Sequence, residues 1–216
     1  MAVQPADWSV VIAGRWNRAI LTPSGIAKRL FGLSEGKPVE VAVPLDGVSP
    51  YIVKHPMQQI AAMTDEGRLL IRASRPDYET LGHAMAAGVN ALASLPETPV
   101  SAAGFNINFR SKEVTSEMAS LLVSESEKAL VDAGFKPVAR TLGRSLEHGA
   151  GALNVTVAGS VDSFGLSLNF HRASEVVDEL KQWLQTPVEQ VKEAVTKVLR
   201  ALGLDVEEVS NDANTE

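Results

Sequence analysis

The sequence contains no cysteine among its 216 residues. This absence excludes disulfides, thiol nucleophiles, zinc sites with thiolate ligands and iron–sulfur clusters. No apolar run approaches the ~20 residues that a membrane-spanning helix needs, and residues 1–8 lack the cationic and apolar regions of a signal peptide. We therefore expect a soluble, cytoplasmic protein, long enough to form a core that needs neither a disulfide nor a metal for stability.

The net charge of −6 comes almost entirely from the C-terminus. Residues 205–216 hold five acidic side chains and no Lys or Arg, which leaves 21 acidic against 20 basic residues in the rest of the chain. A nearly neutral body gives no overall electrostatic attraction to nucleic acid or to an anionic membrane. Partners of these two classes are therefore not indicated by charge.

Alternating and 3.6-residue hydrophobic patterns predict the regular elements. Strands are expected over 8–13, 16–21, 39–43, 51–53, 59–63, 69–71, 100–109, 138–146, 152–157 and 164–170. Helices are expected over 23–32, 77–95, 115–133, 175–184 and 188–202, the last with a capping box formed by Thr186 and Glu189. Strands in runs with helices interposed singly indicate an α+β fold with a largely antiparallel sheet and helices packed on one face.

The predicted organisation is a single α+β domain over residues 1–203, with halves at 1–134 and 135–203. An acidic, disordered tail over 204–216 is expected to follow it. Whether residues 1–53 form a separate subdomain is left open by the pattern.

A weak internal repeat is the most informative feature of the sequence. The segment GFNINFR at 104–110 resembles GLSLNFH at 165–171, and each is followed by an amphipathic segment that begins with acidic residues. This pattern predicts a duplicated strand–helix unit with pseudo-twofold symmetry.

Strand alternation places polar side chains on one face of the repeated strands. The candidate binding residues are Asn106, Asn108, Arg110, Asn169 and His171. Asparagine is disfavoured in strands but both donates and accepts hydrogen bonds, so a row of amides is suited to recognising another backbone or a polar ligand. The alternative is a solvated outer face, which is common in antiparallel sheets.

Sequence motifs of catalysis are missing. The chain has no phosphate-binding loop, dinucleotide fingerprint, His-Glu-x-x-His motif or paired acidic metal motif, and no two of its four histidines stand at helical i,i+4 spacing. We therefore assign no catalytic residue, no metal ligand and no cofactor, and the interpretation leans towards a non-enzyme while an enzyme is left open.

The leading hypothesis is a non-enzymatic protein–protein interaction or assembly module that uses a polar sheet face or edge, with a homo-oligomer expected. One alternative is a small-molecule-binding protein or enzyme with a pocket between the two repeat units. The other is a nucleic-acid-binding accessory protein with a basic patch at Arg68, Arg72 and Arg110. The missing exposed aromatic residues weigh against sheet-based RNA binding.

Overall fold

The computed structural model describes the chain except residues 35–36, 47–48, 66, 112, 161 and 207–216. Its elements run in the order β1 (Ala2–Gly14), α1 (Pro23–Arg29), β2 (Glu40–Ala42), β3 (Ile52–His55), the 3-10 turn η1 (Pro56–Gln58), β4 (Ile60–Thr64), β5 (Arg68–Ala73), α2 (Tyr78–Ser94), β6 (Val100–Ser111), α3 (Ser116–Ser120), α4 (Glu125–Asp132), β7 (Ala139–His148), β8 (Gly151–Ser160), β9 (Phe164–Ala173), α5 (Val177–Leu184), α6 (Val188–Ala201) and β10 (Asp205–Val206).

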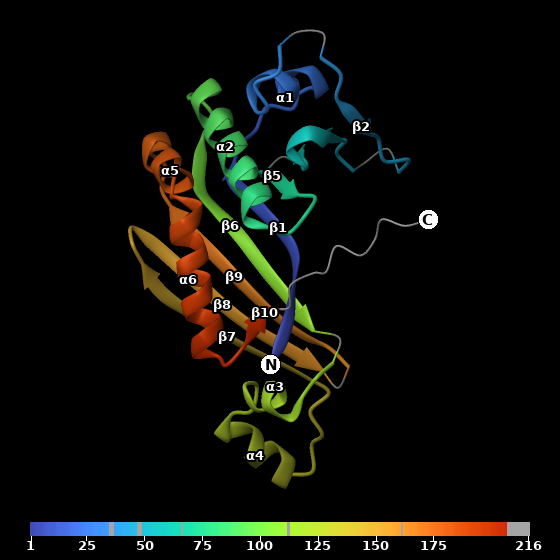
Figure 1. Cartoon of the computed structure of the whole chain (residues 1–216), viewed down its shortest axis with the longest axis vertical. Coiled ribbons are helices and arrows are strands. Elements are labelled where there is room, and N and C mark those ends of the chain that lie inside the picture. The colour runs from blue at the N-terminus through green and yellow to red at the C-terminus, as the bar shows by residue number, and fades with distance from the viewer. Residues whose placement is uncertain (35–36, 47–48, 66, 112, 161, 207–216) are drawn as a thin grey trace.

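The strands form one sheet in the order β2-β3-β4-β5-β1-β6-β9-β8-β7, and neighbours on this path are antiparallel. Helices α2, α5 and α6 lie together over one face of the sheet, while α1 and the pair α3–α4 lie towards its two ends (Figure 1). The predicted α+β class, with an antiparallel sheet and helices on one face, is confirmed.

The topology repeats in two halves. In each half a long strand leads to a short helical excursion, then to three strands in a meander whose last strand pairs with the first, and then to a helix that packs on the sheet. The units are β1–α1–β2–β3–β4–β5–α2 and β6–α3–α4–β7–β8–β9–α5, where the short strand β2 is an addition at the outer edge of the first unit, and β1 and β6 are the central pair. The topological boundary falls between α2 and β6, whereas the sequence suggested halves that divide after residue 134.

The repeated segments at 104–110 and 165–171 are neighbours in space. They lie on β6 and β9, which pair antiparallel with Ile107 opposite Leu168. Because these two residues also match each other in the sequence repeat, a local twofold axis passes between them and relates one segment to the other. The sequence repeat therefore lies entirely within the second unit. In the topological repeat, the counterpart of β6 is β1, so the duplicated unit is larger than the strand and helix that the sequence indicated.

The core lies between the sheet and the helices. One strand face carries the buried side chains Val10, Ile12, Phe105, Leu168 and Phe170, each no more than 1% exposed. Helix α2 begins at an N-cap, Asp77, whose carboxylate accepts a hydrogen bond from the Thr80 amide at 2.8 Å. It contributes Leu81, Ala84 and Leu92 to the same buried cluster. Close packing of α2 on β1 uses Gly88, where an added Cβ would lie 3.4 Å from both Val10 and Ile12.

Four local predictions differ from the structure. The strand expected over 16–21 is absent from the structure, where residues 18–22 form turns and bends, and the helix expected over 115–133 is divided into α3 and α4 by residues 121–124. The capping box is wrong because the Thr186 hydroxyl donates to the carbonyl of Trp183 at 2.8 Å and so closes the end of α5 instead of starting α6. The predicted tail begins with β10, which pairs in parallel with Ala2 and Val3 of β1; the rest of the predicted tail lies outside the described residues.

The close approach of β6 and β9 at Gly104 generates a prediction about stability. A Cβ built on Gly104 would lie 2.4 Å from the backbone oxygen of Phe170, so Gly104→Ala must push the two strands apart. We expect Gly104→Ala to lower the free energy of unfolding by about 1–3 kcal/mol in urea denaturation. Gly165→Ala in the same ladder is the control, because its Cβ would meet only atoms at 3.8 Å or more. Equal stability of the two variants would contradict the prediction.

Candidate functional site: the open face of the sheet

One face of the sheet carries no described helix, and we call it the open face. Strand registers place mainly small and polar side chains there. They include the four asparagines at 106, 108, 154 and 169, together with Ser9, Arg72, Ser145, Thr156, Ser167 and His171. Most are half-buried by their neighbours on adjacent strands. The open face is thus polar, and most of its polar side chains are only partly accessible to solvent.

Five side chains form a continuous hydrogen-bonded line across five strands, which we call the amide row. The Ser145 hydroxyl on β7 donates to Asn154 Oδ1 on β8 at 2.7 Å. Asn154 Nδ2 donates to Asn169 Oδ1 on β9 at 2.9 Å, and Asn169 Nδ2 donates to Asn106 Oδ1 on β6 at 2.8 Å. Asn106 Nδ2 then donates to the Ser9 hydroxyl oxygen on β1 at 3.2 Å. Each pair is directly opposite in register.

The amide row has a direction. Every donor in it points from β7 towards β1, so each asparagine uses one N–H and its oxygen within the row. At the last position Ser9 only accepts, and no described residue accepts the hydroxyl proton of Ser9. The row therefore ends on β1 with a free donor.

A β-bulge shapes the open face beside the end of the row. The β1–β6 register shifts between Ala6 and Ser9, so Asp7 and Trp8 together stand opposite Ile107. Asp7 adopts φ 50°, a left-handed conformation that aspartate tolerates better than most side chains. The extra residue turns Trp8 into the core, where its ring contacts Tyr78 edge-on with centroids 4.9 Å apart.

The bulge also brings three polar groups together. Asn108 Nδ2 donates to the Asp7 carbonyl at 2.8 Å, and an Arg110 guanidinium nitrogen donates to Asp7 Oδ2 at 2.7 Å. Both members of this ion pair are 69% exposed, so water screens most of its energy. On the core side, Trp8 Nε1 donates to the Asn108 carbonyl at 3.1 Å. Arg110 is thus held near the bulge by Asp7.

A depression of about 390 Å³ lies on the open face at this point. It is lined by residues of β1, β5 and β6, namely Asp7, Trp8, Ser9, Val11, Arg68, Leu70, Arg72, Ala73, Asn106 and Asn108. Its volume falls in the range of small-ligand sites. Since β1 and β6 are the first strands of the two halves, the depression lies at the junction of the topological repeat.

The candidate binding residues from the sequence therefore share one face. Asn106 and Asn169 are bonded to each other, and Asn108 and Arg110 are joined through Asp7. His171 lies one register step along the strand from Asn169, opposite Gly104 and Ala152, and makes no hydrogen bond with another described residue. Whether these five residues bind anything stays a prediction.

Sequence reasoning missed Asp7 and Ser9. Ser9 alternates with Trp8 and Val10 in an ordinary strand pattern, and the bulge leaves no local signature. Only the neighbour relation between β1 and β6 shows that Ser9 completes a line of amides.

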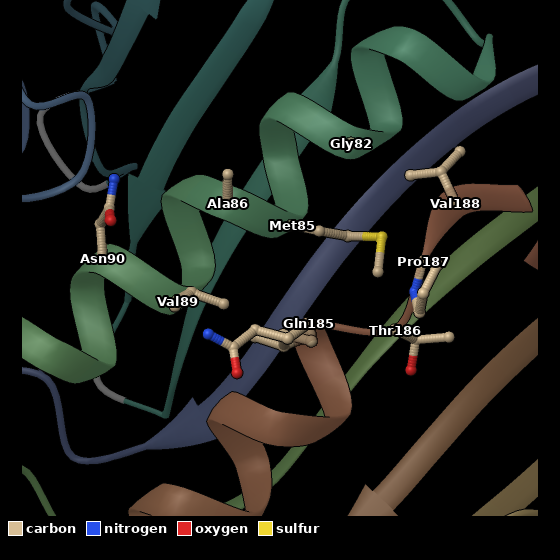
Figure 2. Close-up of a pocket in the computed structure, with 10 residues that line it drawn as sticks. Gly82, Met85, Ala86, Val89, Asn90, Gln185, Thr186, Pro187 and Val188 are labelled. Atoms are coloured by element: carbon tan, nitrogen blue, oxygen red, sulfur yellow. The ribbon is translucent and has the colours of Figure 1, made fainter.

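A second hollow of about 350 Å³ lies on the helical side, between α2 and the turn from α5 to α6. Figure 2 shows Met85, Val89, Pro187 and Val188 around it, with Asn90 and Gln185 at its side. Asn90 Nδ2 already donates to the Leu30 carbonyl at 3.0 Å, and the lining contains no ionisable group. It is therefore an apolar hollow without acid–base chemistry.

The other titratable groups with shifted pKa values, such as His55 and Tyr78, do not indicate a catalytic site or a metal site. Burial lowers the pKa of His55, whose ring lies edge-on to Phe31, and burial raises the pKa of Tyr78 to about 12. Both changes favour the neutral side chain. Within the described part of the chain, no three His, Asp or Glu side chains lie close enough to hold a metal ion. No helix there is both long and apolar enough to cross a membrane.

The amide row predicts a cost for removing its middle member. Asn169→Ala leaves Asn154 Nδ2 and Asn106 Oδ1 without partners, and we expect the free energy of unfolding to fall by about 1–2 kcal/mol. Ser167→Ala on the same strand face is the control, because the Ser167 hydroxyl has no hydrogen-bond partner among the described residues. Urea denaturation of both variants measures the difference, and an equal loss in each would contradict a stabilising row.

The bulge predicts a ranking of substitutions at Asp7. Glycine and asparagine adopt the left-handed conformation readily, so Asp7→Gly and Asp7→Asn are expected to stay close to the original stability. Asp7→Ala is expected to be less stable than Asp7→Gly by about 1 kcal/mol, because alanine is strained at positive φ. Thermal and urea unfolding check this ranking; an alanine variant as stable as the glycine variant would show that the bulge is not required.

Comparisons with known proteins identify no family for this chain. No protein-family model matches it, and no curated protein matches it. Among solved structures, a similar chain is Methanococcus jannaschii TBP, at 9% identity over 94% of this chain and 97% of that chain, with a TM-score of 0.29. A likeness of this strength assigns neither the fold nor the function.

Proposed function

We propose that the protein is a non-enzymatic interaction module that associates through β7, the longer of the two edge strands on the main path of its sheet, with a second copy of itself as the partner. The observation that carries this proposal is the exposure of β7. This ten-residue strand pairs only with β8 within the described part of the chain. Long exposed edge strands readily pair with another chain unless they are blocked.

The hairpin fixes which backbone groups of β7 are available. His148 stands opposite Gly151 across the two-residue turn at Gly149 and Ala150. In such a hairpin the residues that flank the turn exchange hydrogen bonds, and the bonding alternates along the strand. The N–H and C=O groups of Thr141, Gly143 and Ser145 therefore point away from β8, towards the open edge.

The side chains of β7 favour pairing with a second β7 in one register. With Gly143 opposite Gly143, Thr141 meets Ser145 of the second copy, and Leu142 meets Arg144 of the second copy. Centring the pair on Arg144 would instead place two guanidinium groups directly opposite each other, which is unfavourable. A twofold axis through Gly143 thus gives a self-complementary strand pair, as an isologous dimer requires.

Exposed apolar side chains beside β7 would add buried apolar surface to the dimer interface, because one pair of strands alone buries little. Leu146 on β7 is 45% exposed, and Val131, Phe135 and Val138 are 50%, 66% and 79% exposed. Helix α4, which carries Val131, is held to β7 by two hydrogen bonds from Arg140 to the Glu127 carboxylate at 2.7 and 2.5 Å. A second copy that covers these side chains would remove apolar surface from water.

The nucleic-acid hypothesis receives less support. Two of the three arginines of the predicted basic patch are engaged in ion pairs, Arg68 with Asp65 at 2.9 Å and Arg110 with Asp7 at 2.7 Å. Of the three, only Arg72 has no ion pair among the described residues, and the neighbouring carboxylates of Asp65 and Asp7 would oppose phosphate binding at the other two.

Strand pairing at β7 is tested with substitutions at Gly143. A proline there removes an N–H that faces the open edge, while the hydrogen bonds to β8 are retained. We expect the protein to be a dimer in native mass spectrometry and sedimentation at micromolar concentration, and Gly143→Pro to be a monomer with an unchanged circular dichroism spectrum. Gly143→Ala should stay dimeric, because an added Cβ meets no atom within 4 Å.

Two outcomes would overturn the proposal. The first is a monomeric protein at these concentrations, and the second is a Gly143→Pro variant that remains dimeric. A dimer that is lost on substitution of Val131 and Phe135 but not of Gly143 would assign association to α4 instead of to the strand edge.

A further inference from the structure

We propose that the depression at the β-bulge is a binding site for a short aliphatic carboxylate, held by the Arg72 guanidinium and the Ser9 hydroxyl. This site goes beyond the proposed function and does not depend on pairing at β7. Its residues belong to β1, β5 and β6 in the middle of the sheet, three to five strands away from β7.

Arg72 supplies the charge. It is exposed on the open face of β5, directly opposite Ser9 of β1. No described residue forms an ion pair or a hydrogen bond with its guanidinium, whereas Arg68 and Arg110, the other arginines on this face near the depression, each bind an aspartate. A free guanidinium presents parallel N–H groups that match the two oxygens of a carboxylate.

Ser9 supplies a directed donor. Its oxygen accepts from Asn106, so its own proton is turned away from the amide row and is available in the depression. Four hydrogen bonds that point the same way polarise one another and make the last hydroxyl a better donor. Cross-strand partners have Cβ atoms about 5 Å apart, so one carboxylate can reach both Ser9 and Arg72.

The charge of the depression selects a monoanion. Its ionised lining groups are Asp7, Arg68 and Arg72, which together carry one net positive charge. A carboxylate neutralises that charge, whereas a phosphate dianion would exceed it and would also be repelled by the Asp7 carboxylate. One N–H of Asn106 and one of Asn108 already donate to Ser9 and to the Asp7 carbonyl, which reduces the number of donors for a third phosphate oxygen.

The apolar side chains of the depression favour a ligand whose carboxylate is attached to a short aliphatic chain. Val11 and Leu70 are cross-strand partners on the open face and line the depression beside Ser9 and Arg72. Both are half-buried, so a chain of two or three methylene groups can cover them. This chemistry occurs in a free short-chain carboxylate and in a glutamate side chain of a peptide.

The experiment is a titration followed by ¹H–¹⁵N NMR of the backbone and of the arginine Nε–H groups, at constant ionic strength set with sodium chloride. The probes are sodium acetate, sodium butyrate, sodium phosphate and the blocked peptide Ac-Ala-Glu-Ala-NH2. We expect the Arg72 Nε–H and the Ser9 amide to shift in a saturable way, with butyrate tighter than acetate and acetate tighter than phosphate. A peptide tighter than butyrate would identify a protein segment as the source of the carboxylate, and a weaker one a free ligand.

Variants separate the site from general charge effects. Arg72→Gln should weaken butyrate binding by about tenfold or more, and Ser9→Ala by several-fold, as expected for hydrogen bonds to a charged group. Arg200→Gln is the matched control: Arg200 is an exposed arginine near the end of α6, on the helical side of the sheet, and its loss should change the affinity less than twofold. Thermal unfolding verifies that each variant is folded.

Three results would overturn the site. They are an Arg72 resonance that does not move, an affinity order with phosphate first, and equal weakening by Arg72→Gln and Arg200→Gln. Repeating the titration on Gly143→Pro keeps this test apart from the proposed dimer, because a monomeric variant should bind butyrate as the original protein does.

Discussion

The antiparallel pairing of β1 with β6 is the interaction on which the rest of the structure depends. Each strand is the first of its half, and each half attaches its meander to the outer side of that strand. All hydrogen bonds of the sheet that join the two halves on the main path therefore pass through this one ladder. The core depends on the same register, because it aligns Val10 with Phe105 beneath the helices. The bulge at Asp7 is the point where this ladder departs from regularity, and it also creates the depression.

The open face combines extended strand structure with several asparagine side chains, a combination that is usually unfavourable. Asparagine is a poor strand residue, and a polar group that is partly buried without a partner costs about 1–3 kcal/mol. The amide row removes this cost because each member satisfies the next one. The hydrogen bonds of the row fix the orientation of each middle amide, which keeps one N–H outside the row. The two end members, Ser9 on β1 and Ser145 on β7, each make a single hydrogen bond within the row.

The sequence predicted much of this face but not its bulge. Period-two alternation in 104–110 and 165–171 placed Asn106, Asn108 and Asn169 on one side, because alternation is a local property of strands. Which strands lie next to each other depends on the whole chain, so the contact of Ser9 with Asn106, across 97 residues, had no local signal. The bulge is equally non-local, because it exists only relative to the partner strand. Thr186 was misinterpreted because it lies between two helices, and its hydroxyl bonds to the Trp183 carbonyl at the end of α5 instead of capping α6.

The direction of the amide row links its two ends physically. Reversing the row would require the Ser9 hydroxyl to donate to Asn106, and this hydroxyl could then no longer donate to a ligand in the depression. A carboxylate bound at Arg72 and Ser9 would therefore favour the direction in which Ser145 donates inward to Asn154. In that direction the Ser145 oxygen faces the edge as an acceptor, and the side chain opposite it in the Gly143-centred pair is Thr141 of the second copy, which has a hydroxyl to donate. The two proposed sites are thus compatible with the same orientation of the row, and neither site needs the other.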